Sequence, residues 1–306
     1  MALRSLSFLV FSLLAIGSVA CSAGGGGRAS GSDSAGSGAG SGGGGITGSG
    51  AGTGGINITV GPGAGSGAGG DDCGSTLDVT YRDFNESHPD FERPFAGDVV
   101  RLQLIQPNLG ADSTPVFRDS VGCPQDPNKP DSCANWVPQQ PVITSADTFN
   151  QWYHTVDGVN LKFAKTLKLE EDMPGSGNYV FDSPNFFPLG PNEGFGITPK
   201  GNPQGQNFLF TTEIHVNFKY VAGQVFTFRG DDDLWIFVNN KLALDLGSTH
   251  AAVQGTINFD AQAAALGISP GGSYPMDIFQ AERHTSASDF RFETNISCFT
   301  PGPVPK

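Results

Sequence analysis

Short stretches of alternating apolar and polar residues recur along the last three quarters of the chain, separated by glycine, proline and asparagine. They are rich in aromatic and β-branched residues, which is the pattern of half-buried strands. Many short strands with turn residues between them predict an all-β sandwich. The predicted strands are 76–81, 99–104, 161–169, 178–181, 207–218, 226–228, 234–238, 242–244, 256–259, 274–281 and 290–297, with short helices at 149–154 and at 261–266, the second capped by Asp260.

The first quarter of the chain lacks this pattern. Residues 22–70 are nearly all glycine, serine and alanine, with too little apolar surface to offset the entropy lost on ordering. The composition changes abruptly at Cys73. We therefore predict a disordered Gly/Ser-rich linker over 21–72, one sandwich domain over 73–300 and a short tail over 301–306.

Residues 1–20 have the features of a secretory signal peptide: an early Arg4, an apolar core over 6–16 and small residues before Cys21. A cysteine in that place resembles a bacterial lipobox, in which Cys21 carries the lipid. Ser18 stands where an aliphatic residue is usual, so plain cleavage is the alternative. No second apolar span follows, and we expect membrane contact only through a lipid anchor.

The formal net charge of −13 argues against a nucleic-acid or anionic-membrane partner.

The other four cysteines suit disulfides in an exported chain, and three pairings are possible. Cys123 and Cys133 bracket a short loop rich in proline and aspartate, while Cys73 and Cys298 bracket the whole domain. We predict Cys73–Cys298 and Cys123–Cys133. A zinc site is the rival interpretation, but it lacks CxxC spacing.

Three consecutive acids, Asp231, Asp232 and Asp233, follow Gly230 in a tight loop between two predicted strands. Adjacent carboxylates repel one another unless something neutralises them, and the usual remedy is a hard cation bound through oxygen ligands. A solvated acidic turn is the alternative. Asn239 and Asn240 have the chemistry of a hairpin turn.

The stretch GDDDLWIFVNNKLALDLGSTH (230–250), with GTINF (255–259) and YPMDIFQAERH (274–284), resembles the fibro-slime domain of bacterial and slime-mould surface proteins. Further motifs, among them YRDF (81–84) and SDFRFET (288–294), follow the family pattern in the same order over about residues 77–298. That domain is similar to the protective-antigen-type (PA-14) β-sandwich of adhesins. The resemblance implies a jelly-roll-like sandwich with long loops.

In those adhesins an Asp-Asp pair joined by a cis peptide holds a calcium ion, which takes sugar hydroxyls as ligands. The matching pair here is Asp231 and Asp232. A further oxygen comes from the loop before the final strand, where this chain has Asp289 in place of the usual asparagine. The substitution is expected to keep calcium binding and to alter ligand preference.

Weaker candidates for ligand contact are Asp233, His250 and His284, although structural hydrogen bonding is the expected role of the two histidines. Glu282 and Arg283 stand beside them in the sequence. We expect these two residues to form a structural bridge between strands.

The resemblance implies a calcium-dependent carbohydrate-binding or adhesive surface module of a bacterial lipoprotein, on the cell surface or outer membrane, or of a secreted protein. Its partner would be a glycan or matrix polysaccharide, bound by monomeric domains acting multivalently. The alternative is a structural slime or coat protein with a purely structural calcium site and a protein partner. We expect no enzymatic activity, because consecutive acids on one loop are a poor arrangement for a glycosidase and no hydrolase motif occurs.

Overall fold

The computed structural model describes residues 74–92, 99–126, 129–133 and 140–303. The predicted signal peptide and the predicted linker, with Cys21, lie outside these ranges, as do Cys73 and the last three residues. Within the described part of the chain, no helix combines the length and apolar character needed to cross a membrane.

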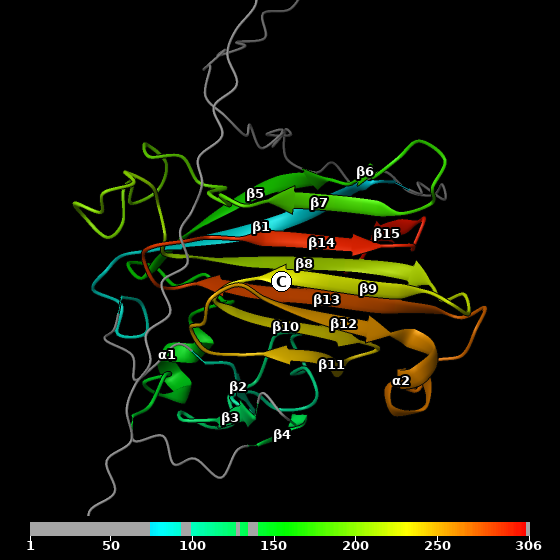
Figure 1. The fold of residues 1–306 in the computed structure, drawn as a ribbon. Coiled ribbons are helices and arrows are strands. Elements are labelled where there is room, and N and C mark those ends of the chain that lie inside the picture. The colour runs from blue at the N-terminus through cyan, green and yellow to red at the C-terminus, as the bar shows by residue number, and fades with distance from the viewer. Residues whose placement is uncertain (1–73, 93–98, 127–128, 134–139, 304–306) are drawn as a thin grey trace, which may run out of the picture. The chain divides into compact units, whose positions relative to one another are not determined.

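Two antiparallel sheets pack face to face, which confirms the all-β sandwich (Figure 1). The larger sheet has seven strands in the order β11-β10-β13-β8-β1-β5, with β15 beside β8. The smaller sheet has the order β12-β9-β14-β7-β6. The larger sheet consists of β1 (Thr76–Phe84), β5 (Asn160–Lys168), β8 (Phe210–Lys219), β10 (Asp233–Val238), β11 (Lys241–Leu246), β13 (Ser273–Glu282) and β15 (Phe299–Pro301), and the smaller of β6 (Glu170–Glu171), β7 (Tyr179–Ser183), β9 (Val225–Gly230), β12 (Val253–Asn258) and β14 (Phe290–Thr294).

The main core lies between the two sheets, because successive side chains of a strand point to opposite faces. From the larger sheet, every second residue of β8 points inward. From the smaller sheet, the inward positions of β9 and β14 are phenylalanines. This core includes Ile214, Val216, Phe218, Phe226, Phe228, Phe290 and Phe292, all of them buried.

The outer face of the larger sheet is also covered, by the long segment between β1 and β5. This segment holds β2 (Arg101–Leu102), β3 (Cys123–Asp126), β4 (Lys129–Cys133) and α1 (Ala146–Asn150). Its aromatic side chains build a second core with those of β10 and β13, centred on Trp152, Trp235 and Phe279. The sheet is therefore buried on both faces, which explains why all of β10 is apolar except its first residue.

One predicted disulfide is confirmed and the other is partly outside the description. Cys123 and Cys133 are bonded and join β3 to β4. Cys298 is also disulfide-bonded, but its predicted partner Cys73 lies outside the described residues.

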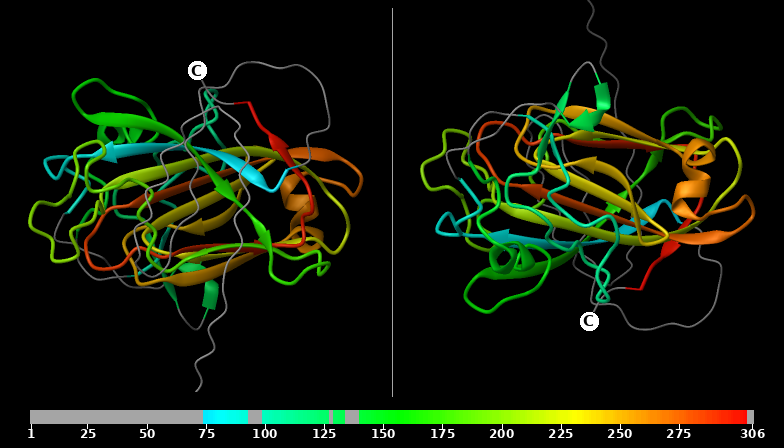
Figure 2. Two further views of the ribbon diagram at one scale, coloured as in Figure 1. Left: turned by 90° about the horizontal axis from the view of Figure 1, so that it is seen from above. Right: turned by 90° about the horizontal axis from the view of Figure 1, so that it is seen from below.

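Both helices begin at residues that the sequence patterns did not identify. The first predicted helix, 149–154, is instead α1, which begins after the N-cap Ser145 in a capping box with Thr148. The second, α2 (Phe259–Leu266), is capped by Asn258 and not by Asp260. Asp260 accepts a hydrogen bond from the Tyr220 hydroxyl. The two helices lie toward opposite ends of the sandwich (Figure 2).

A polar network lies on the outer face of the larger sheet, across β1, β8 and β13. Glu213 accepts hydrogen bonds from Arg82 and from His215 Nε2, and His215 Nδ1 bonds Asp277 at 2.7 Å. All four side chains are buried. Burial alone would lower the pKa of His215, but the hydrogen bonds and charges of Asp277 and Glu213 outweigh it and raise the pKa to about 9.

Candidate functional site

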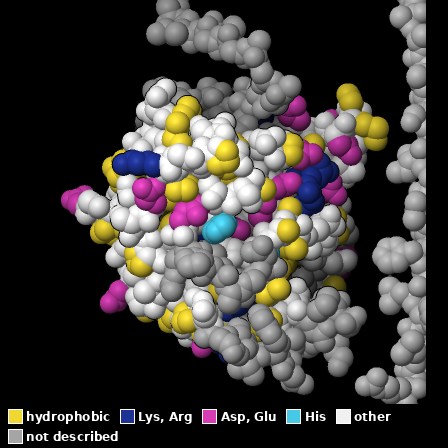
Figure 3. Space-filling view, turned by 60° about the vertical axis from the view of Figure 1, so that its left-hand side comes forward, with side chains coloured by type: hydrophobic (Ala, Val, Ile, Leu, Met, Phe, Trp, Pro, Cys, Tyr) yellow, Lys and Arg dark blue, Asp and Glu magenta, His cyan; other side chains and the backbone are white. Residues whose placement is uncertain are grey.

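Three connections pass from one sheet to the other at the same end of the sandwich. Residues 231–232 link β9 to β10, residues 247–252 link β11 to β12, and residues 283–289 link β13 to β14. Together they line a cavity of about 350 Å³. Figure 3 shows this end of the molecule, where acidic side chains gather around a histidine.

The Asp231–Asp232 pair forms the shortest of these connections and hydrogen-bonds to both others. Asp231 Oδ1 accepts from the N–H of Asp289 at 2.6 Å. Asp232 Oδ2 accepts from the N–H of Arg283 at 3.0 Å, and its Oδ1 accepts from the N–H of His250 at 3.4 Å. The peptide bond between the two acids is cis, as the resemblance implies.

Gly230 is required here by the close approach of the β13–β14 connection. A Cβ at this position would lie 2.4 Å from the backbone oxygen of Asp289 and within 3 Å of the Phe228 ring. The N–H of Asp231 donates to that same oxygen. A side chain at residue 230 would therefore push apart the segments that carry Asp231 and Asp289.

Burial sets the electrostatics of the acidic pair. It raises the pKa of Asp231 to about 6, with a contribution from the charge of Asp289. It raises the pKa of Asp232 well above its usual range, opposed by Arg283 and reinforced by Asp233. Each ionised carboxylate is thus costly in this place, and a bound cation would offset that cost.

Asp289, the third predicted calcium ligand, lines the cavity, and its carboxylate is held by an arginine. Arg229 Nη1 lies 2.9 Å from Asp289 Oδ2 and donates to Oδ1 at 3.2 Å. Burial raises the pKa of Asp289, and Arg229 opposes this shift. The extra charge of Asp289, relative to the asparagine usual in the resembling family, is therefore matched by Arg229.

Asp233, the third acid, is directed into the protein. Its Oδ2 accepts from Arg283 Nε at 2.6 Å and its Oδ1 from the N–H of Ser248 at 2.6 Å. Arg283 also donates from Nη1 to the backbone oxygens of Asp90 and Val142. Asp233 does not line the cavity, and its carboxylate serves as the counter-ion of a buried arginine.

The two histidines line the cavity and bond to backbone, which is the role expected of them. His250 is buried, and its ring nitrogens lie 3.0 Å from the oxygen of Ala251 and 3.3 Å from that of Leu246. Burial lowers its pKa. His284 is more exposed, and its Nδ1 lies 3.0 Å from the oxygen of Thr285.

Glu282 is the residue of this region that the sequence patterns did not assign to the site. It lies at the end of β13 and is fully buried, and within the described structure neither carboxylate oxygen has a hydrogen-bond partner. Arg283 forms a structural bridge as expected, to Asp233 at the start of β10, whereas Glu282 takes no part in it. Burial raises the pKa of Glu282 well above its usual range, and the charges of Asp232 and Asp231 raise it further.

The oxygen-only donors and the excess negative charge fit a hard divalent cation such as calcium. Calcium takes six to eight oxygen ligands, which include carboxylates, backbone carbonyls and water. Among the described residues, no group of three or more His, Cys, Asp or Glu side chains is placed so that it could hold a metal ion. Asp231 and Asp232 would therefore supply part of the shell, leaving the rest to backbone oxygens, water or ligand hydroxyls.

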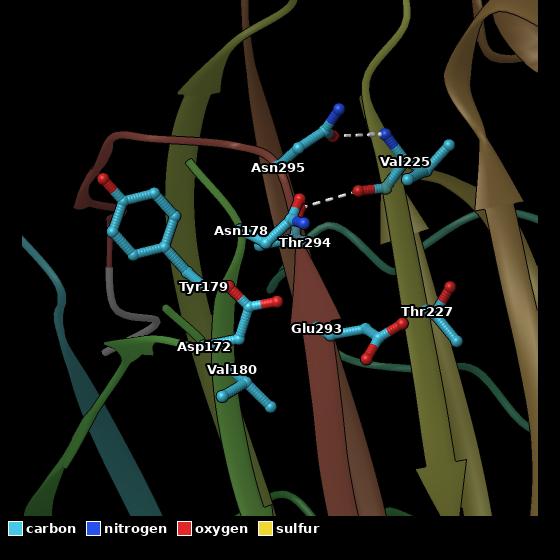
Figure 4. Close-up of a pocket in the computed structure, with 9 residues that line it drawn as sticks. All are labelled: Asp172, Asn178, Tyr179, Val180, Val225, Thr227, Glu293, Thr294 and Asn295. Carbon is cyan, nitrogen blue, oxygen red and sulfur yellow. Dashed lines mark hydrogen bonds between the residues drawn. The ribbon is translucent and has the colours of Figure 1, made fainter. Parts of the chain in front are cut away.

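A second, smaller cavity of about 110 Å³ lies on the smaller sheet, between β7, β14 and β9 (Figure 4). Most of its polar groups already bond to neighbouring loops and strands. Asn295 accepts from the N–H of Val225, Thr294 donates to the oxygen of Val225, and Asp172 accepts from Ser176. These bonds stabilise the strand ends, and we assign this cavity no ligand.

No protein-family model matches the chain. It is 34% identical over 234 residues to protein psiR of Dictyostelium discoideum, covering 73% of this chain and 21% of psiR. It is 36% identical over 224 residues to psiD (72% and 41%) and 33% identical over 234 residues to psiC (74% and 42%) of the same organism. The chain thus spans about a fifth to two fifths of the length of these relatives. The resemblance to the fibro-slime family stays a prediction.

Among solved structures, the chain is similar to the PA14 domain of the MpAFP antifreeze protein, with a TM-score of 0.33 and 10% identity over 79% of this chain and 99% of that one. It is also similar to a PA14 sugar-binding domain from an RTX adhesin, with a TM-score of 0.22 and 16% identity over 31% of this chain and 52% of that one. The sandwich assignment rests on the strand pairing described above.

Proposed function

We propose that this chain is a calcium-dependent carbohydrate-binding module with an adhesive role. The observation that carries the proposal is the acidic pair Asp231–Asp232, which lines an open cavity where three crossover connections meet. Calcium bound there would neutralise the buried carboxylates and leave coordination positions open toward the cavity. Vicinal hydroxyls of a sugar are suited to fill such positions, and no chemical reaction is part of the proposal.

The arginines nearest to the acidic pair are already paired with other acids. Arg229 bonds Asp289, and Arg283 bonds Asp233. Arg229 and Arg283 therefore offset the charges of Asp231 and Asp232 only in part, and the pKa values of both acids stay raised. This charge balance favours a metal ion over a solvated acidic turn, since the two acids are more than nine-tenths buried.

The site would act outside the cell, either on a surface to which Cys21 anchors the chain through a lipid or after secretion. The Cys123–Cys133 disulfide suits an oxidising compartment. A few calcium-bound hydroxyls bury little area, so each domain would bind weakly as a monomer. Useful adhesion to a glycan or matrix polysaccharide would come from many copies on one surface.

A glycan array tests the proposal, probed with the full chain in calcium and again in chelator. We expect calcium-dependent signals that disappear in the Asp231→Asn, Asp232→Asn double variant and persist in Asp157→Asn, which changes an exposed aspartate away from the cavity. Calcium binding without any glycan signal would instead favour a structural calcium site and a protein partner. The hydrogen bonds from Asp231 and Asp232 to both other connections give that alternative its basis.

A further inference from the structure

Glu282 is fully buried close to the acidic pair and does not line the cavity. In β13, Gln280 and Glu282 point to the same face because they are two residues apart. Gln280 Nε2 donates to the backbone oxygen of Asp231 at 3.1 Å, which places this face of β13 against the acidic connection. The next residue, Arg283, donates its N–H to Asp232. Glu282 therefore stands between two residues that both bond the acidic pair.

The Glu282 carboxylate is not compensated by the protein around it. The Ser288 hydroxyl and the N–H of His284 are near enough to lower its pKa, but neither forms a hydrogen bond of normal geometry with it in the described structure. The Ser288 hydroxyl donates instead to the backbone oxygen of Phe186 at 2.7 Å. The guanidinium of Arg283 is directed away, to Asp233.

A fully buried polar group without a partner destabilises a folded protein, and a charged one does so more strongly. Replacing Glu282 by glutamine, which has the same shape and no charge, would remove the part of that cost that comes from ionisation. The acid's position against Asp231 and Asp232 suggests what compensates it. A cation at the mouth of the site would be attracted by all three carboxylates.

We propose that Glu282 is the inner carboxylate of the cation site: its charge, buried close to Asp231 and Asp232, strengthens the binding of a doubly charged ion. This inference rests on the proposed calcium site and adds a residue to it. Glu282 acts through its charge on the cation held by the acidic pair and needs no contact with the glycan. It also explains why an uncompensated acid occupies the end of an otherwise well-bonded strand.

The test is calorimetric titration of calcium chloride into the chelator-stripped full chain, together with melting temperatures in chelator and in calcium. In Glu282→Gln, which keeps the side-chain shape, we expect calcium affinity to fall about tenfold or more. The chelator-stripped variant should melt about 3 °C or more above wild type, because the variant no longer bears the cost of protonating or ionising a buried acid. Its stabilisation by calcium should shrink. If Glu282 were purely structural, its replacement would not lower calcium affinity and at the same time raise the melting temperature in chelator.

Glu293→Gln is the matched control, since it makes the same substitution at an exposed position on the smaller sheet. It should leave calcium affinity and melting temperature unchanged. Glu282→Met, which removes the polar atoms, should reproduce the loss of affinity. Unchanged affinity in both Glu282 variants would overturn the inference, as would a lower melting temperature of both in chelator. If wild type itself binds no calcium, the proposed function fails and the inference fails with it.

Discussion

Asp233→Asn is the substitution that best separates the structural acid from the two acids of the cavity. Asp233 and Arg283 are each 0% exposed and are joined by a 2.6 Å contact between Oδ2 and Nε. An asparagine oxygen can still accept from the N–H of Ser248, so the variant removes the charge with little change of shape. Arg283 would keep its bonds to two backbone oxygens and its position 4.6 Å from the Trp152 ring centroid.

The cost follows from leaving the Arg283 charge buried without its counter-ion. Breaking one partner of a buried ion pair destabilises a protein by about 3–5 kcal/mol. The expected result is therefore a loss of about 3–5 kcal/mol in the free energy of unfolding. By contrast, the exposed control Asp157→Asn should change it by less than about 0.5 kcal/mol.

Urea denaturation of the full chain in chelator measures these differences, followed by tryptophan fluorescence because Trp152 lies against Arg283. The Asp233→Asn, Arg283→Met double variant should recover much of the loss, since it removes both charges. A cost below about 1 kcal/mol for Asp233→Asn would show that the backbone oxygens alone compensate the Arg283 charge. Asp233 would then not be needed as its counter-ion.

Three further predictions concern other parts of the chain. Gly230→Ala places a Cβ 2.4 Å from the Asp289 oxygen, and should lower unfolding free energy by about 1–3 kcal/mol and weaken calcium binding in a titration. Replacing Cys123 and Cys133 by serine opens a loop with a sequence separation of 10; urea denaturation should show a loss of about 3 kcal/mol. His215, with its pKa raised to about 9, contributes stability that is fully present below about pH 6.5 and lost as pH rises through about 9. Unfolding of wild type should therefore lose about 3 kcal/mol more over that range than His215→Gln, and parallel curves would contradict the assignment.

The sequence patterns identified most strands because β-branched and aromatic alternation survives wherever one face is buried. The turn at Asn239 and Asn240 was predictable because asparagine tolerates the positive φ that hairpin turns require, and both residues have positive φ. The segment that covers the larger sheet was less visible. Its elements β3 and β4 are joined by a disulfide, and the sequence there has no periodic apolar residues. The start of α1 could have been predicted from Ser145 and Thr148, because their spacing of three residues is that of a capping box.

The candidate site was predictable in its first two acids and not in their surroundings. Adjacent aspartates in a turn repel one another, and this repulsion can be inferred from the sequence alone for Asp231 and Asp232. Asp233 points into the protein because it pairs with Arg283, fifty residues later, and no local sequence pattern shows that pairing. Glu282 has the same limitation, because its burial is a property of how two sheets meet.

Calcium binding by the acidic pair can be measured by calorimetric titration of calcium into the chelator-stripped full chain and into its Asp231→Asn, Asp232→Asn variant. We expect wild type to bind one calcium ion and the double variant to bind none while remaining folded by circular dichroism. Absence of binding to wild type, or equal binding to both proteins, would contradict this expectation. The acidic pair would then serve only to join the crossover connections, and calcium-dependent glycan binding at this cavity would be wrong.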